Sequence, residues 1–249
     1  MRYFFEIAYH GQNYNGWQSQ RNARGVQAVV ENAVSKLLQA EIKIVASGRT
    51  DTGVHCEQQF FHADIEKEFD IPQLIIKLNS FLPKDIAIYS IRNVKAEASA
   101  RYDAIERTYR YQITRKKNPF LEELAWHYFK EVDVSAMNRA ASLLLGEHDF
   151  ECFSKVKTDV NHFICEIKKA EWREEDHMLT FTITANRFLR GMVRAVVGTL
   201  LDVGTGKTSM KEFQKIISSK DRREAGANVP PQGLYLMKVK YPTHLFVKR

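Results

Sequence analysis

The sequence predicts an α+β fold of two similar domains, each with a mixed, mainly antiparallel sheet and helices packed on one face. Two observations lead to this prediction. Segments that alternate apolar and polar residues, as half-buried strands do, are mixed with segments whose apolar residues recur at helical spacing. In outline, the order of these segments in the first half of the chain is similar to their order in the second half. We therefore expect one domain at residues 1–105 and another at residues 106–249.

The first half of the chain opens with an expected strand, because Tyr3, Phe5, Ile7 and Tyr9 alternate with more polar residues. Residues 11–25 break this regularity. From Val26 onward apolar residues recur three and four positions apart, which predicts a helix. Shorter apolar runs mark the remaining elements. We expect strands at residues 42–46, 58–64 and 86–93, a loop at 47–55 and a helix at 71–81.

The second half shows the same two kinds of periodicity. We expect strands at residues 108–114, 167–172, 179–184 and 234–239, and helices at 135–145 and 188–203. On the last of these helices, Arg187, Arg190 and Arg194 would share one face. Gly191 and Gly198 flank that face, and such small residues would let another backbone or a substrate come close.

The composition indicates a folded protein with a large core, because 44% of its 249 residues are hydrophobic. Lys and Arg outnumber Asp and Glu by 37 to 30, and this net charge of +7 favours a polyanionic partner. Charged residues near the start argue against a signal peptide, and no apolar run reaches the roughly 18 residues of a membrane helix. We therefore expect a cytoplasmic protein without membrane contact. Three cysteines without a C-x-x-C pair indicate reduced thiols.

One glycine-rich loop carries the first candidate for chemistry. Residues 48–55 read GRTDTGVH, and taken alone Asp51 would be a turn former, as Asp in such loops usually is. The string, however, resembles the signature of the tRNA pseudouridine synthase A family, GRTDAGVH, and differs only at Thr52. Five further blocks resemble the family's other motifs in order. They are YHG, Tyr14, GWQ and Gln20 within residues 9–20, RTYRY at 107–111, LLGEHDF at 144–150, FLRGMVR at 188–194 and PQGLYL at 231–236.

The resemblance implies a cofactor-free isomerase that converts uridine to pseudouridine at positions 38, 39 and 40 of the tRNA anticodon stem-loop. It implies a homodimer, and an active-site cleft between the two domains. Asp51 would be the catalytic group, Arg194 its ion-pair partner and Leu234 a substrate contact. A carboxylate suits the reaction because cleavage of the glycosidic bond develops positive charge on the ribose. Whether Asp51 attacks C1′, attacks uracil C6 or acts as a base stays open.

The strand around Tyr109 offers a platform for the extruded base. Alternation places Arg107, Tyr109 and Tyr111 on one face of this strand. An aromatic strand residue is usually core, but bases that leave an RNA stack are commonly held against an aromatic ring. The family match assigns that role to Tyr109 and leaves Tyr111 in the core.

Several basic residues are candidates for contacts with the RNA. Arg49 would touch the RNA backbone or fill the space that the base leaves. Further candidates are Arg21, Arg24, Lys155, Lys157 and Arg190. Four departures from the family are expected to affect the choice of tRNA more than catalysis: His10 in place of Asp, Thr52 in place of Ala, ASAR at residues 98–101, and no Arg-Thr pair in residues 158–165.

Two other classes of function remain as alternatives. One is an RNA-binding module without turnover, which loss of Asp51 would have indicated. The other is an Asp-nucleophile phosphatase, for which a second acid and Mg²⁺ would be expected nearby. The string GTGKT at residues 204–208 lacks the first glycine of a P-loop and follows a helix, so we expect no nucleotide cofactor. His55 beside Cys56, and His148 beside Asp149, lack the further ligands that a metal site needs.

Overall fold

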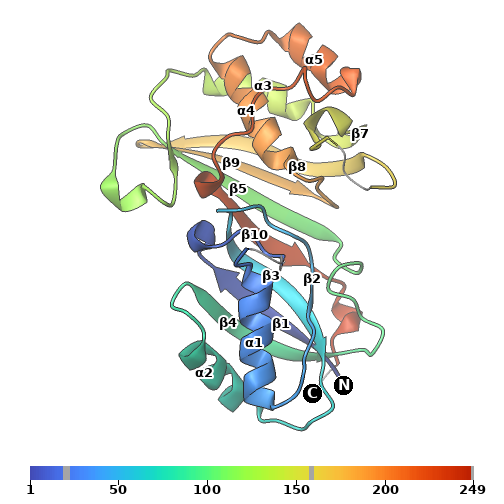
Figure 1. The fold of residues 1–249 in the computed structure, drawn as a ribbon. Coiled ribbons are helices and arrows are strands. Elements are labelled where there is room, and N and C mark those ends of the chain that lie inside the picture. Colours follow the sequence, from blue (N-terminus) through green and yellow to red (C-terminus); the bar gives the residue numbers. More distant parts are fainter. Residues whose placement is uncertain (19–22, 157–159, 248–249) are drawn as a thin grey trace. The chain divides into compact units, whose positions relative to one another are not determined.

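The computed structural model describes residues 1–18, 23–156 and 160–247 (Figure 1). By its internal contacts the chain divides into two compact units. The first unit is Met1–Ile105 together with Tyr235–Arg249, and the second is Glu106–Leu234. Each unit contains its own set of strands and helices.

The first unit is built on a mainly antiparallel sheet in the order β4 (Ile86–Val94), β1 (Arg2–Tyr9), β3 (His55–Asp64) and β10 (Leu234–Lys240). Strand β1 runs antiparallel to both β3 and β4, and the short β2 (Val45–Ala46) pairs with β3. Helix α2 (Ile71–Phe81) packs against β4 and against α1 (Val26–Leu38). Stacked rings of Phe5 and Phe61, whose centroids lie 4.7 Å apart, join β1 to β3 in the core.

The C-terminal segment belongs to the first unit, so the expected second domain of residues 106–249 is wrong at its end. Strand β10 pairs with β3 in parallel, and Tyr235 lies opposite His55. Beyond the strand, the Tyr241 hydroxyl donates to the carbonyl oxygen of Ala100 at 2.6 Å. The alternation at residues 234–239 predicted a strand, but the choice of sheet is made by long-range pairing, which alternation does not encode.

The second unit is built on the antiparallel order β5 (Glu106–Thr114), β9 (Met178–Ala185), β8 (Ile164–Glu175) and β7 (Gly146–Asp149). The short β6 (Trp126–His127) pairs with β5 in parallel. Helix α3 (Val134–Ser142) packs on β8 and on α4 (Met192–Gly204), and α5 (Met210–Ser219) follows. Among the residues that the structure describes there are also five short 3-10 helices: Gly11–Asn13, Pro119–Leu121, Glu151–Phe153, Pro231–Gly233 and Thr243–Leu245.

Most of the expected elements are confirmed, with three exceptions in the residues discussed next. The helix expected from residue 188 begins only at Met192, because Gly191 before it has φ +74° and interrupts helical geometry. Of the strand expected at 42–46, only Val45–Ala46 pairs. Helix α5 was missed, although Ser209 and Glu212 form a capping box at its start.

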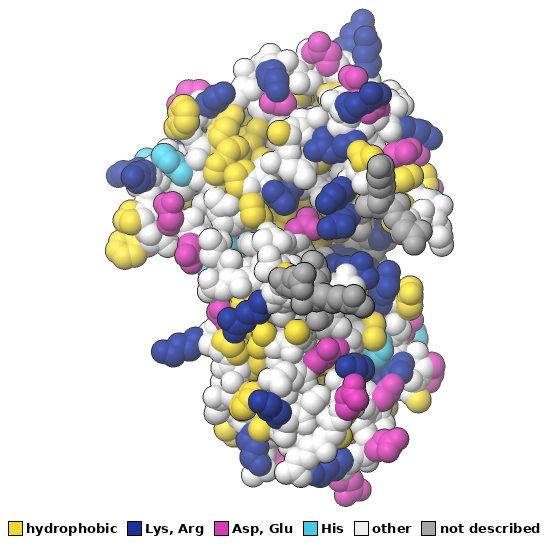
Figure 2. Space-filling model, viewed as in Figure 1, with side chains coloured by type: hydrophobic (Ala, Val, Ile, Leu, Met, Phe, Trp, Pro, Cys, Tyr) yellow, Lys and Arg dark blue, Asp and Glu magenta, His cyan; other side chains and the backbone are white. Residues whose placement is uncertain are grey.

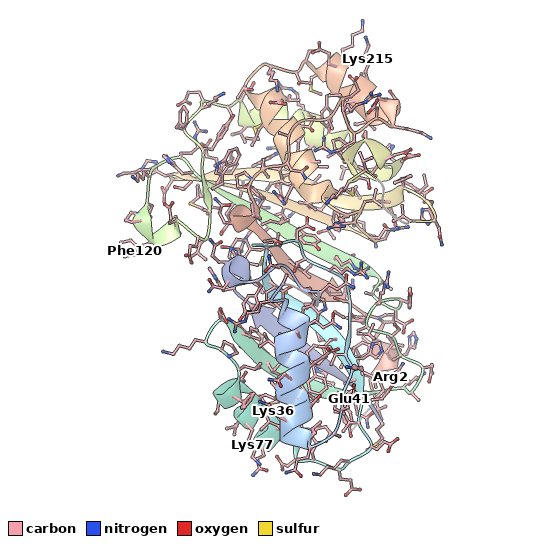
Figure 3. The ribbon with its side chains drawn as sticks, viewed as in Figure 1. Arg2, Lys36, Glu41, Lys77, Phe120 and Lys215 are labelled. Carbon is pink, nitrogen blue, oxygen red and sulfur yellow. The ribbon has the colours of Figure 1, made fainter. Side chains whose placement is uncertain are left out.

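Two further observations concern the apolar residues that the structure describes. None of the helices in this part of the chain has both the length and the apolar character that crossing a membrane requires. Phe120 is 87% exposed, more than any other large apolar side chain described, and Figure 3 shows it at the outer end of its loop.

Candidate active site

The Asp51 loop joins β2 to β3 in the first unit and rests on a buried hydrogen-bond network. The Tyr9 hydroxyl lies 2.8 Å from Thr50 Oγ1 and donates to Gln59 Oε1 at 3.2 Å. Gln59 Nε2 in turn donates to the carbonyl oxygen of Gly48 at 3.1 Å. Tyr9, Thr50 and Gln59 are all buried, so this network holds the side chain of Thr50, the residue that precedes Asp51, in the protein interior.

The segment of residues 11–17 braces the same loop through backbone contacts. Trp17 N donates to the carbonyl oxygen of Thr50 at 3.2 Å, and Gly53 N donates to that of Tyr14 at 3.3 Å. A Cβ on Gly16 would lie 2.3 Å from the carbonyl oxygen of Thr50, so only glycine fits there. The N-terminal motif and the Asp51 motif, distant in sequence, are therefore one structural assembly.

Asp51 stands at the turn of this loop. Its carbonyl oxygen accepts from Val54 N at 3.2 Å, and Gly53 within the turn has φ +76°. The residue is half-buried, whereas Arg49 is exposed and Thr50 is buried. Asp51 is therefore part of a backbone turn, as expected for an Asp in such a loop, and it is also partly shielded from solvent.

His10, which replaces the family's Asp, lies beside a ladder of rings. Its ring centroid is 4.4 Å from that of His55, which stacks on Tyr235 at 4.7 Å. Gly11 N donates to His55 Nδ1 at 3.0 Å, so that nitrogen carries no proton. These rings line a hollow of about 270 Å³, together with residues that include Asp85. The departure at residue 10 therefore faces this hollow.

Tyr109 lies on β5 in the second unit with its ring against Phe188. The two ring centroids are 5.0 Å apart and the ring planes are nearly perpendicular, at 86°. Tyr109 is half-buried, which leaves part of the side chain accessible to a base. Tyr111 is fully buried and confirmed as core, and its hydroxyl donates to the carbonyl oxygen of Pro230 at 2.8 Å. Sequence reasoning missed Phe188 as a partner, although it opens the FLRGMVR block.

The prediction that Arg187, Arg190 and Arg194 share one face of a single helix is wrong. Arg187 and Arg190 precede α4, and only Arg194 lies in it. Arg194 is half-buried, and its Nε donates to the carbonyl oxygen of Val229 at 2.6 Å. Arg187 Nη1 instead lies 3.1 Å from His162 Nε2. The guanidinium groups of Arg187 and Arg194 therefore have different hydrogen-bond partners.

The remaining expected RNA contacts are distributed over both units. Arg24 is exposed and its guanidinium lies 5.4 Å from the centroid of the Tyr14 ring. Lys155 and Arg190 are both exposed and adjacent, since Lys155 N donates to the carbonyl oxygen of Arg190 at 2.9 Å. Figure 2 shows several Lys and Arg side chains on the viewed face of the second unit. Leu234 is buried at the start of β10. Arg21 and Lys157 lie outside the described residues.

Within the described residues, no group of three or more His, Cys, Asp or Glu side chains could hold a metal ion. The cysteines Cys56, Cys152 and Cys165 are free thiols and buried. Burial raises the pKa of the Cys165 thiol to about 11 and that of Cys56 well above its ordinary value. These thiols are therefore protonated at neutral pH and are poor nucleophiles and poor metal ligands.

Comparison with known proteins gives one consistent family. A family model described as tRNA pseudouridine synthase matches residues 7–103 and 140–242. The chain is 46% identical to tRNA pseudouridine synthase A of Porphyromonas gingivalis over 99% of each chain. It is also 46% identical to the protein of the same name in Parabacteroides distasonis, over 98% of each. A crystal structure of an archaeal box H/ACA sRNP complex matches with TM-score 0.36 and 12% identity over 78% of this chain and 45% of the other, which is too distant to carry an argument.

Proposed function

The chain belongs to the tRNA pseudouridine synthase family, and on that premise we propose that it isomerises uridine to pseudouridine in the anticodon stem-loop of tRNA. The observation that carries the proposal is the identity of 46% over 99% of both chains with a tRNA pseudouridine synthase A. The proposed sites are positions 38, 39 and 40. The proposed setting is a homodimer in the cytoplasm.

The reaction breaks the bond between ribose C1′ and uracil N1, turns the base, and joins C1′ to C5. The C5 hydrogen leaves as a proton and N1 gains a proton, so the composition of the nucleotide is unchanged. Positive charge develops on the ribose as the first bond breaks, and a carboxylate stabilises it by a covalent bond or by its charge. We assign this task to Asp51, whose loop is fixed by Tyr9 and Thr50.

Asp51 has to be ionised in surroundings that exclude water, and desolvation alone would favour its neutral form. An arginine partner resolves this conflict, because a guanidinium stabilises the charged carboxylate. We assign this role to Arg194 from its place in the family's FLRGMVR motif. The half-buried setting of Arg194 supports the assignment, since a shielded guanidinium interacts more strongly than an exposed one.

The flipped uracil is proposed to stack on Tyr109. Stacking on an aromatic ring contributes about 1–3 kcal/mol per base. The ring of Phe188 stands edge-on to Tyr109 and restricts its rotation. Leu234 is proposed to make an apolar contact with the base.

Contacts with the RNA backbone are proposed for basic side chains that include Arg49, Arg24 and the adjacent pair Lys155 and Arg190. All four are exposed, as phosphate contacts require. Arg21 is assigned to the same group from its sequence position alone. Each phosphate contact adds to the salt dependence of binding, so we expect the affinity for tRNA to fall steeply as salt rises.

The test of this function is release of tritium from tRNA labelled at uracil C5, because only replacement of the C5 hydrogen by carbon frees the label. We expect wild-type protein to release it, and Asp51→Asn to bind tRNA nearly normally and release none. Asp64→Asn is the matched control, since that exposed carboxylate pairs with Arg2 and lies at the end of β3 that is distant from the loop. Wild-type binding without release would favour an RNA-binding module, and Mg²⁺-dependent phosphate release would favour a hydrolase. Wild-type turnover by Asp51→Asn would overturn the assignment.

A further inference from the structure

Residues 226–230 lie against helix α4 in the second unit, and this 226–230 segment meets the helix backbone to backbone. Val229 N donates to the carbonyl oxygen of Arg194 at 3.3 Å, and Gly226 N donates to Thr199 Oγ1 at 2.9 Å. A Cβ on Gly198 would lie 1.9 Å from the carbonyl oxygen of Ala227. The sequence predicted that Gly198 would let another backbone come close to the helix, and that backbone is the 226–230 segment.

Thr199 anchors the segment from inside the helix. Its side chain is fully buried, and its hydroxyl donates to the carbonyl oxygen of Ala195 at 2.8 Å while accepting from Gly226 N. One hydroxyl thus joins the backbone of α4 to the N–H group of Gly226. Thr199 lies five residues beyond Arg194 on α4, and Val229, the hydrogen-bond partner of Arg194, lies three residues beyond Gly226 in the segment.

The segment also controls the guanidinium group of Arg194. Arg194 Nε donates to the carbonyl oxygen of Val229 at 2.6 Å. A guanidinium can bind a carboxylate with two parallel bonds either from Nε and one Nη or from the two Nη atoms. Because Val229 takes up the Nε–H, a bidentate contact with a carboxylate has to use the edge formed by the two Nη atoms.

The neighbouring carbonyl group connects the segment to the strand that carries Tyr109. Tyr111 donates its hydroxyl proton to the carbonyl oxygen of Pro230 at 2.8 Å. Burial raises the pKa of Tyr111 well above its ordinary value, so the hydroxyl keeps the proton that it donates. Two consecutive carbonyl groups, those of Val229 and Pro230, therefore hold residues of α4 and of β5.

We propose that the 226–230 segment is a positioning element that sets the orientation of the Arg194 guanidinium and presents its Nη edge to the catalytic carboxylate. The inference rests on the proposed function. It names Thr199, Gly198 and Tyr111 as positioning residues, which act through Arg194 and the Tyr109 strand without touching the substrate.

A matched pair at Thr199 tests the proposal. Thr199→Val keeps the volume and removes the hydroxyl, whereas Thr199→Ser keeps the hydroxyl. In single-turnover tritium release we expect Thr199→Val to be slower by about tenfold, with the Kd for tRNA changed less than about twofold, and Thr199→Ser to remain within about twofold of wild type in both. Equal rates for the two variants, or a loss confined to Kd, would overturn the proposal.

A spectroscopic measurement reports on Arg194 itself. In protein labelled with ¹⁵N at arginine Nε, the Arg194 signal is assigned by its loss in Arg194→Lys, and its bond to Val229 predicts slow exchange of the Nε proton with water. We expect Thr199→Val to speed this exchange and Thr199→Ser to leave it unchanged. A slower reaction with an unaltered Arg194 signal would refute positioning through this group. If wild-type protein released no tritium, the proposed function would fail while the exchange result still stood.

Two further variants guard against a fold defect at Thr199. Tyr111→Phe removes one hydroxyl and should lower the release rate with little change in Kd, because Pro230 loses its donor. Gly198→Ala forces the segment away from α4 and should give the larger effect on Arg194 Nε exchange. Circular dichroism confirms that each variant is folded, and normal rates and exchange in both folded variants would contradict the proposal.

Discussion

Replacing Tyr9 by Phe should weaken the Asp51 loop without altering the shape of the core. The hydroxyl that is lost bridges Thr50 Oγ1 and Gln59 Oε1, and all three residues are buried. Leaving buried polar groups short of a partner costs about 1–3 kcal/mol. For a protein of this size, each kcal/mol lowers Tm by about 2–4 °C. The expected decrease in Tm is therefore several degrees for a change of one oxygen atom.

The same change should slow the reaction, because Thr50 precedes the catalytic carboxylate. A loss of about 1.4 kcal/mol in the catalytically competent loop corresponds to about a tenfold lower rate. Tritium release under single-turnover conditions measures this rate, and differential scanning fluorimetry measures Tm. The Kd for tRNA should change little, since the Tyr9 hydroxyl is buried and bonded to Thr50 and Gln59.

Tyr89→Phe is the control for this prediction. Tyr89 lies in the same unit on β4 and is 59% exposed, so loss of its hydroxyl should change stability by less than about 0.5 kcal/mol. If Tyr9→Phe and Tyr89→Phe gave the same Tm and the same release rate, the buried network would not be what holds the loop, and the argument would fail.

Three further predictions follow from single contacts. Phe188→Leu removes the edge-to-face partner of the Tyr109 ring and should lower the release rate severalfold and the free energy of unfolding by about 0.5–1.5 kcal/mol, which is what such a ring pair contributes. Burial lowers the pKa of His62 in the folded state, so the unfolded chain takes up a proton first as pH falls and the free energy of unfolding should decrease below the ordinary pKa of 6.5. Chemical denaturation across pH 5–8 checks this, and His62→Asn, which does not titrate, should show a smaller decrease. Gly11→Ala should abolish release, because its Cβ would lie 1.9 Å from a carbonyl oxygen, whereas Gly48→Ala meets no atom within 4 Å and should retain activity in the same assay.

The sequence predicted a loop at residues 47–55, and the structure has this loop up to Val54. The role proposed for Asp51 in it comes from a contiguous string, which can be recognised without knowing the fold. Periodicity also located β4, β5 and α2, where each element has a clear apolar face. It failed at the start of α4, since the residues around Gly191 continue the apolar spacing while the backbone there is left-handed. Spacing reports which side chains are apolar, and a single glycine can end a helix without altering that spacing.

The contacts that hold the proposed catalytic residues were not predictable for a related reason. At Gly16 and Gly198 a carbonyl oxygen from a distant segment occupies the place of a side chain. The sequence shows that a glycine is present, but the partner, Thr50 in one case and Ala227 in the other, depends on the tertiary fold. In the first unit, Asp51 directly follows Thr50, the residue that Gly16 contacts. In the second unit, Arg194 lies four residues before Gly198, which contacts Ala227. Positioning by backbone contact tolerates wide variation in the side chains of the supporting segment, because carbonyl groups are common to all residues. Substitutions that add a Cβ at these glycines are consequently more informative about catalysis than changes to the surrounding side chains.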